Sequence, residues 1–228
     1  MQPTPSEPFS RIEVPTTLEA SVAVDGALLL RWSLRNDGDR TIYVFDRPMA
    51  RGPRGERIDD PDAPYRFVRD QRLRVLIGDS PLPRLASVTT HAYPRATPLA
   101  PGASLKRSQR IALPAMEHAA YWSLGAIRRH PEATPPPFEA APVAMVDLLV
   151  DYVAERPGLA VTAAEIEGAV RFATMGDVYA GVVRLHRAMP VEGVTALRRV
   201  HLDARPRLGH EEEEPLPTIP EPKPETQA

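Results

Sequence analysis

Cysteine is absent from the 228 residues of the chain, and lysine occurs only at Lys106 and Lys223. The first absence excludes disulfides, cysteine-ligated zinc and thiol catalysis. No apolar run approaches the roughly 18 residues that a membrane-crossing helix needs, and the amino terminus lacks the basic and apolar regions of a secretory signal. These absences predict a protein that does not insert into a membrane. They favour a cytoplasmic location, or a periplasmic one if a leader preceded Met1.

Charge and motif content exclude further classes of function. The formal net charge is -2, which gives no basic footprint for nucleic acid. The chain has no glycine-rich phosphate loop and no G-x-S-x-G motif, and no spacing of its six histidines would place two on one metal. The sequence therefore predicts no catalytic residue, no metal, no cofactor and no nucleic-acid partner.

Proline is abundant, with 27 residues in the chain, about twice the usual frequency. Many prolines, Pro142 and Pro190 among them, lie where an apolar segment would end. Because proline removes a backbone donor from a β-ladder, this distribution predicts short strands with irregular connections.

Residues 17–46 carry the strongest fold signal. Three segments of alternating polarity are separated by two turn signals, which predicts a β-meander. Asp25 and Gly26 fit a two-residue type I′ turn, and Asn-Asp-Gly-Asp at 36–39 fits a longer one.

The second of these segments also defines its two faces. Arg31, Ser33 and Arg35 alternate with apolar residues, so a slip of one residue would move the arginines into the core. The residues expected on the buried face are Leu28, Leu30, Trp32 and Leu34.

Later segments continue the strand pattern. A short edge strand is predicted at 9–14, further strands near 65–77 and after Pro101-Gly102, and a surface loop from Arg47 to Pro64. Residues 143–154 place Asp147 and Asp151 on the face opposite their apolar neighbours. For residues 162–175, strands are favoured, and a short helix capped by Thr162 and Glu165 is the alternative.

The predicted organisation is a flexible leader at residues 1–8, one β-sandwich domain at 9–203, and a disordered, acidic, proline-rich tail at 204–228. The tail contains four consecutive glutamates and frequent prolines, so it lacks the apolar residues that a core requires.

Two phrases resemble a known type of domain. LLLRWSLRNDGDRTIYVFD, at residues 28–46, resembles the strand-turn-strand opening of intracellular proteinase-inhibitor-like domains. LAPGASLKRSQRIALP, at 99–114, is similar to the Pro-Gly turn and strand found later in them. The resemblance implies an all-β, immunoglobulin-like antiparallel β-sandwich of bacterial origin. It also implies a binding or inhibitory role.

Two groups of residues are the candidate binding sites. Arginines at positions 47, 51, 54 and 57 lie in a long polar segment, where guanidinium groups could bind a partner's carboxylates. The preferred hypothesis is a non-enzymatic module that binds an unknown protein partner. The alternative is a small-molecule or carbohydrate-binding sandwich with a stacking platform; a hydrolase ranks third. The candidate residues are Arg47, Arg51, Arg54 and Arg57 for a partner, and Tyr93, Tyr121 and Trp122 for stacking.

Overall fold

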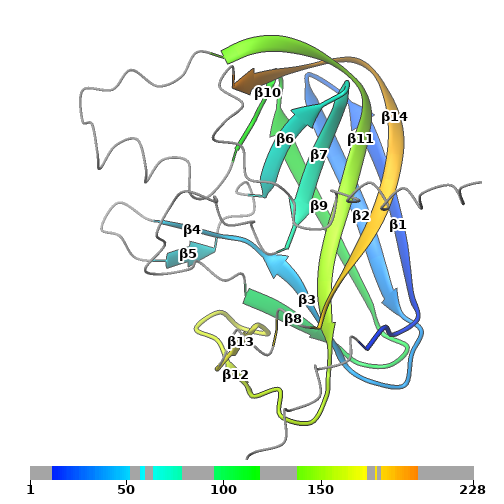
Figure 1. Ribbon diagram of the computed structural model, residues 1–228, viewed down its shortest axis with the longest axis vertical. Helices are drawn as coiled ribbons and strands as arrows, with labels where there is room; N and C mark the ends of the chain where they lie inside the picture. Colours follow the sequence, from blue (N-terminus) through cyan, green and yellow to red (C-terminus); the bar gives the residue numbers. More distant parts are fainter. Residues whose placement is uncertain are drawn as a thin grey trace, which may run out of the picture.

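The computed structural model describes residues 12–51, 57–59, 64–78, 95–118, 138–173, 178 and 181–199. Within these ranges the regular elements are strands, which confirms the predicted all-β class (Figure 1). The strands are β1 (Thr16–Val24), β2 (Ala27–Asn36), β3 (Ile42–Arg47), β4 (Met49–Arg51), β5 (Arg57–Asp59), β6 (Tyr65–Arg69), β7 (Arg72–Ile77), β8 (Arg95–Leu99), β9 (Ser104–Ala112), β10 (Ala115–Met116), β11 (Phe138–Ala154), β12 (Val161–Ala163), β13 (Val170–Phe172) and β14 (Val182–Arg199).

Two sheets pack against each other as a β-sandwich. The small sheet has the order β1-β2-β9. The large sheet runs β10-β14-β11-β3-β8-β13-β12, with β7 paired to β11 and β6 paired to β7. β4 and β5 form a separate hairpin. In Figure 1, β1 runs alongside β14, and the two are joined where Arg187 Nε donates to the carbonyl of Leu18 at 2.9 Å.

The core lies between the inner faces of the two sheets. Leu30 and Trp32 of β2 meet Leu148 and Val150 of β11 in one apolar cluster. Leu30, Leu148 and Val150 are fully buried, and Trp32 is 4% exposed. The faces predicted for β2 are confirmed, because period-two alternation places its arginines in solvent.

β2 and β3 belong to different sheets, so the predicted β-meander is wrong. Asn36 at the end of β2 is fully buried. Its Nδ2 donates to the carbonyls of Arg40 at 2.7 Å and Leu99 at 2.9 Å, and its Oδ1 accepts the N–H of Gly38 at 3.1 Å. These bonds satisfy the backbone of an arch that carries the chain from one sheet to the other.

The β1–β2 turn contains three residues and is not the predicted two-residue type I′ turn. Val24 lies opposite Leu28, and Gly26 has a φ of 59°. Cross-strand partners share a face, so a two-residue turn would set Ala20 opposite Arg31. The observed register sets Ala20 opposite Trp32 instead, which keeps the apolar faces together.

β11 and β14 continue through Pro142 and Pro190, where strand ends were predicted. Pro190 lies opposite Met145, next to a register shift between Val143 and Met145. Gly193, with a φ of 69°, lies in the same irregular part of β14. A bulge is one of the few places in a sheet that tolerates proline, because its ladder is already interrupted.

Residues 12–15 precede β1 without forming the predicted edge strand; residues 9–11 lie outside the described ranges. Val14 is nevertheless buried. The hydroxyl of Tyr152 donates to the carbonyl of Val14 at 2.8 Å and accepts its N–H at 3.2 Å. These two bonds take the place of a β-ladder at this position.

Three further expectations can be compared with the structure. The predicted surface loop from Arg47 to Pro64 contains the β4–β5 hairpin. Strands β12 and β13 pair within residues 161–173, so for the described part of 162–175 the favoured strands are confirmed and the helix alternative is wrong. Residues 174 and 175 lie outside the described ranges. The pairs β7–β11 and β10–β14 are parallel, so the sandwich is not purely antiparallel.

The predicted leader and tail lie outside the described residues. Among the residues that the structure does describe, no helix has the length and hydrophobicity needed to cross a membrane.

Candidate functional site

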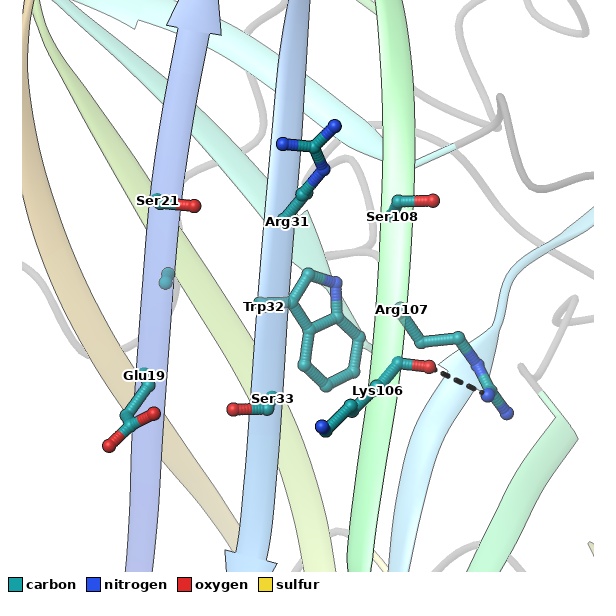
Figure 2. A pocket seen from close by; sticks show the side chains of 9 residues that line it. Glu19, Ser21, Arg31, Trp32, Ser33, Lys106, Arg107 and Ser108 are labelled. Carbon is teal, nitrogen blue, oxygen red and sulfur yellow. Dashed lines mark hydrogen bonds between the residues drawn. The ribbon is translucent and has the colours of Figure 1, made fainter.

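The outer surface of the small sheet is the candidate site, and we call it the β1-β2-β9 face. Strand pairing arranges its side chains in rows that cross the three strands. Figure 2 shows two of these rows. The rows are Ser21-Arg31-Ser108 and Glu19-Ser33-Lys106, and Arg110 lies in the next row, opposite Leu29.

The sequence of β9 explains which of its side chains reach this face. Leu105 and Ile111 are buried between the sheets, so period-two alternation turns Lys106, Ser108 and Arg110 outward. β2 follows the same rule and turns Arg31 outward.

A hollow of about 590 Å³ lies over the centre of this face. Its outward-pointing residues include the small Ser21, Ser33 and Ser108, with Arg31 and Lys106 beside them (Figure 2). The hollow is open to solvent, and hydroxyl donors and acceptors alternate with cations within it. Such a surface suits an extended polar chain.

Arg31, Lys106 and Arg110 have no ion-pair partner among the described residues. Arg31 and Lys106 lie on a diagonal of neighbouring strands, as do Arg31 and Arg110, so their Cα atoms are about 7–8 Å apart. Along β9, Lys106 and Arg110 are about 14 Å apart. The three cations therefore surround Ser108 and concentrate positive charge there.

The single acid on this part of the face offsets only part of this positive charge. Glu19 lies on β1, in the row of Ser33 and Lys106. Two strand spacings, roughly 9.6 Å, separate it from Lys106. Glu19 is also the diagonal neighbour of Arg31 on the paired strand, about 7–8 Å away between Cα atoms, so it offsets part of the charge of that arginine and leaves Lys106 and Arg110 without an adjacent acid.

The outer surface of the large sheet differs from the β1-β2-β9 face, because Arg72, Arg74 and Arg184 form ion pairs there. Asp147 on β11 is 2% exposed. Arg72 donates to it through Nε at 2.6 Å and through a second nitrogen, Arg74 Nε lies 3.6 Å away, and His186 Nε2 lies 2.9 Å away. Burial alone raises the pKa of Asp147, but the hydrogen bonds and charges of Arg72 and His186 outweigh it and lower the pKa.

The pKa values of the two neighbouring arginines reflect the same network. The hydrogen bond to Asp147 raises the pKa of Arg72. For Arg74, burial is the largest effect and lowers its pKa, while the charge of Asp147 acts in the other direction. Both arginines thus serve to neutralise a buried carboxylate.

Asp151 lies four residues after Asp147, on the same face of β11, and is also fully buried. Arg184 donates to both of its oxygens, from Nε at 2.7 Å and from a terminal nitrogen at 2.9 Å. Gly78 packs directly on this carboxylate, since a Cβ there would lie 2.3 Å from Asp151 Oδ2. The site is closed to ligands by its own packing.

Arg107 alternates with Lys106 and points away from the β1-β2-β9 face. Its Nε donates to Asp46 Oδ2 at 2.7 Å, and Asp46 Oδ1 accepts the N–H of Thr97 at 3.2 Å. This pair joins β9 of the small sheet to β3 of the large sheet. Arg107 is therefore ion-paired within the protein.

The predicted arginine cluster is only partly described. Arg47 ends β3, is half-buried, and has its Nε 4.0 Å from Asp46 Oδ2. Arg51 and Arg57 are cross-strand partners in the β4–β5 hairpin, which brings their backbones together, and Arg54 lies outside the described residues. A binding role for these arginines stays a prediction.

The predicted stacking residues Tyr93, Tyr121 and Trp122 also lie outside the described residues. Sequence reasoning placed Arg31 on an exposed face but did not identify Lys106 or Arg110 as functional candidates. The alternation in 104–112 marks both as outward-facing. Their proximity to Arg31 depends on the pairing of β2 with β9, which brings together residues that lie about 75 positions apart in the sequence.

Within the described ranges, no group of three or more histidine, aspartate or glutamate side chains could hold a metal ion. Comparison of the chain with protein-family models, curated proteins and solved structures gave no significant match.

Proposed function

We propose that this protein is an interaction module that binds an acidic, extended segment of a partner protein on its β1-β2-β9 face. The observation that carries the proposal is the exposed and unpaired state of Arg31, Lys106 and Arg110 on adjacent strands. Like charges this close repel each other in the free protein. A bound acidic segment relieves that repulsion.

The spacing of the cations defines the ligand. Alternate side chains of an extended peptide advance about 6.8 Å and share one face. Lys106, Arg31 and Arg110 belong to three successive rows of this face, which are spaced by two residues along β9. A peptide that runs along β9 with acids at positions i, i+2 and i+4 can therefore place one acid at each row. Three cations and a net charge of -2 favour a short acidic peptide over nucleic acid, whose binding needs many phosphate contacts.

We also propose that the sandwich is immunoglobulin-like. In such sandwiches the first, second and fifth strands share one sheet, and the third, sixth and seventh share the other. The orders β1-β2-β9 and β3-β11-β14 correspond to these, whereas β8 pairs with β3 in the large sheet and not with the fifth-strand equivalent β9. This correspondence and the resemblance to proteinase-inhibitor-like domains support a binding role, although one fold hosts many functions.

The test is titration of the protein with a fluorescent twelve-residue peptide that carries glutamate at alternate positions, followed by anisotropy at 50 mM salt. The variant Arg31→Gln, Lys106→Gln, Arg110→Gln should lose at least tenfold in affinity. A control with the same net charge, Arg40→Gln, Arg69→Gln, Arg171→Gln, should bind as the wild type does.

Folding and salt provide two further checks. The melting temperature of the Arg31, Lys106 and Arg110 variant should stay within about 2 °C of wild type, because these side chains make no pairing that stabilises the fold. Binding should weaken steeply between 50 and 300 mM salt. Equal losses of affinity in both triple variants would overturn the proposed site.

A further inference from the structure

The β1-β2-β9 face has a complementary segment within the same chain. Residues 211–214 are four consecutive glutamates, beyond the end of β14. We propose that this glutamate segment binds the β1-β2-β9 face in cis and competes with the partner's acidic segment. The inference rests on the proposed function, because it assigns an internal competitor to the same face.

Charge complementarity is the first argument. In an extended conformation the four glutamates divide into two alternating pairs, and the members of each pair are about 6.8 Å apart. That spacing matches the step from Lys106 to the level of Arg31, or from that level to Arg110. Two carboxylates can then contact cations that otherwise have no partner among the described residues.

The second argument is the position of the end of β14. Ala196 pairs with Ala115 of β10, and β10 follows β9 after two residues. Arg199, the last residue of β14, therefore lies near the end of β9 that carries Arg110. In the upper part of Figure 1, the end of β14 lies near the end of β9. The path from Arg199 to Arg110 runs along β14 to Ala196, across one strand spacing to Ala115, and back along the chain to Arg110. These three parts add up to at most about 32 Å.

Chain length is sufficient to close this distance. Residues 200–210 separate Arg199 from Glu211. Twelve Cα–Cα steps span up to about 40 Å, so the glutamates reach the face without full extension.

Tethering makes weak contacts sufficient. A tether of this length gives an effective concentration on the order of 1 mM. If the glutamate segment has an intrinsic Kd of about 0.1 mM, it occupies the face about 90% of the time and weakens a competing peptide about tenfold.

The experiment uses the full chain with Glu211→Gln, Glu212→Gln, Glu213→Gln and Glu214→Gln, titrated with the same fluorescent acidic peptide. This variant should bind the peptide about tenfold more tightly than wild type. A control that neutralises four acids elsewhere should bind as wild type does. The control substitutions are Asp39→Asn, Asp70→Asn, Glu167→Gln and Glu192→Gln.

The outcomes separate the two proposals. If the peptide binds wild type and the glutamate variant equally, through Arg31 and its neighbours, the cis contact is refuted and the proposed function stands. If the peptide binds neither protein, the proposed function fails. If the control gains as much affinity as the glutamate variant, net charge and not the segment is responsible, which also refutes the cis contact.

A direct measurement is available because the chain has no cysteine. Gly209→Cys provides a single attachment point for a nitroxide spin label, two residues before the glutamates. The amide signals of 106–110 should broaden, while those of the β12–β13 hairpin should not. Neutralising the four glutamates should restore the signals; unbroadened signals in the labelled wild-type chain would overturn the inference.

Discussion

Asp147→Asn tests the buried carboxylate that organises the outer surface of the large sheet. Asp147 is 2% exposed and faces Arg72, Arg74 and His186. The substitution keeps the size of the side chain but removes its charge. It leaves two guanidinium groups without their counter-charge.

The structure limits the size of the effect. Removing one partner of a fully buried pair costs about 3–5 kcal/mol. Here the cations are partly solvated, since Arg72 is 33% exposed and His186 is 51% exposed. Solvent screening therefore reduces the expected loss to about 2–3 kcal/mol, or a fall in melting temperature of about 5–10 °C.

Urea unfolding at pH 7, at pH 3 and at pH 2 is the assay. The pKa of Asp147 is lower in the folded protein than its ordinary value of about 3.9. Its stabilisation is therefore complete above that ordinary value and is lost as the pH falls through the folded pKa. The difference between wild type and Asp147→Asn should be full at pH 7 and should shrink below about pH 4.

Two results would refute this reasoning. One is a loss below about 0.5 kcal/mol at pH 7; the other is a difference that persists undiminished at pH 2. A double-mutant cycle with Arg72→Gln isolates the pair, and we expect a coupling energy of at least about 1 kcal/mol.

Three other substitutions give sharp expectations. Gly38→Ala places a Cβ 2.1 Å from Val14 Cγ1, so we expect a loss of about 1–3 kcal/mol by urea unfolding, and unchanged stability would contradict the close approach. Tyr152→Phe removes both hydrogen bonds to the backbone of Val14; calorimetry should show a loss of about 1–2 kcal/mol, and a neutral result would count against this anchor. Ser33→Glu places an acid directly between Lys106 and Glu19 and should weaken binding of the acidic peptide, while stability changes by less than about 0.5 kcal/mol because attraction to Lys106 and repulsion from Glu19 oppose each other; peptide affinity equal to wild type would exclude Lys106 from the site.

Local pattern predicted the faces of the strands but not their partners. The alternation in β2 placed Trp32 in the core and Arg31 in solvent, and both assignments hold. The turn at Asp25-Gly26 was mispredicted because its local preference gave way to register, which the apolar faces of the two strands determine together. The crossing from β2 to β3 depends on the buried side chain of Asn36, and composition alone cannot distinguish such an arch from a hairpin.

The candidate site shows the same division between local and long-range information. The face of Asp147 on β11 was predicted correctly, but its burial was not, because Arg72 and His186 come from strands distant in sequence. Likewise, each exposed cation of the β1-β2-β9 face can be read from alternation within its own strand. The grouping of Arg31 with Lys106 and Arg110 appears only when β2 pairs with β9.

The small residues of the β1-β2-β9 face are as informative as its cations. Ser21 and Ser108 are the cross-strand partners of Arg31, and Ser33 is the partner of Lys106. An acid in place of Ser21 or Ser108 would form a cross-strand ion pair with Arg31 and stabilise the sheet, as Asp147 and Asp151 do on the large sheet. Serine keeps the positive charge uncompensated and leaves the backbone accessible. Stability and anion binding therefore favour different residues at these positions, and the serines present are those that the proposed binding function would require.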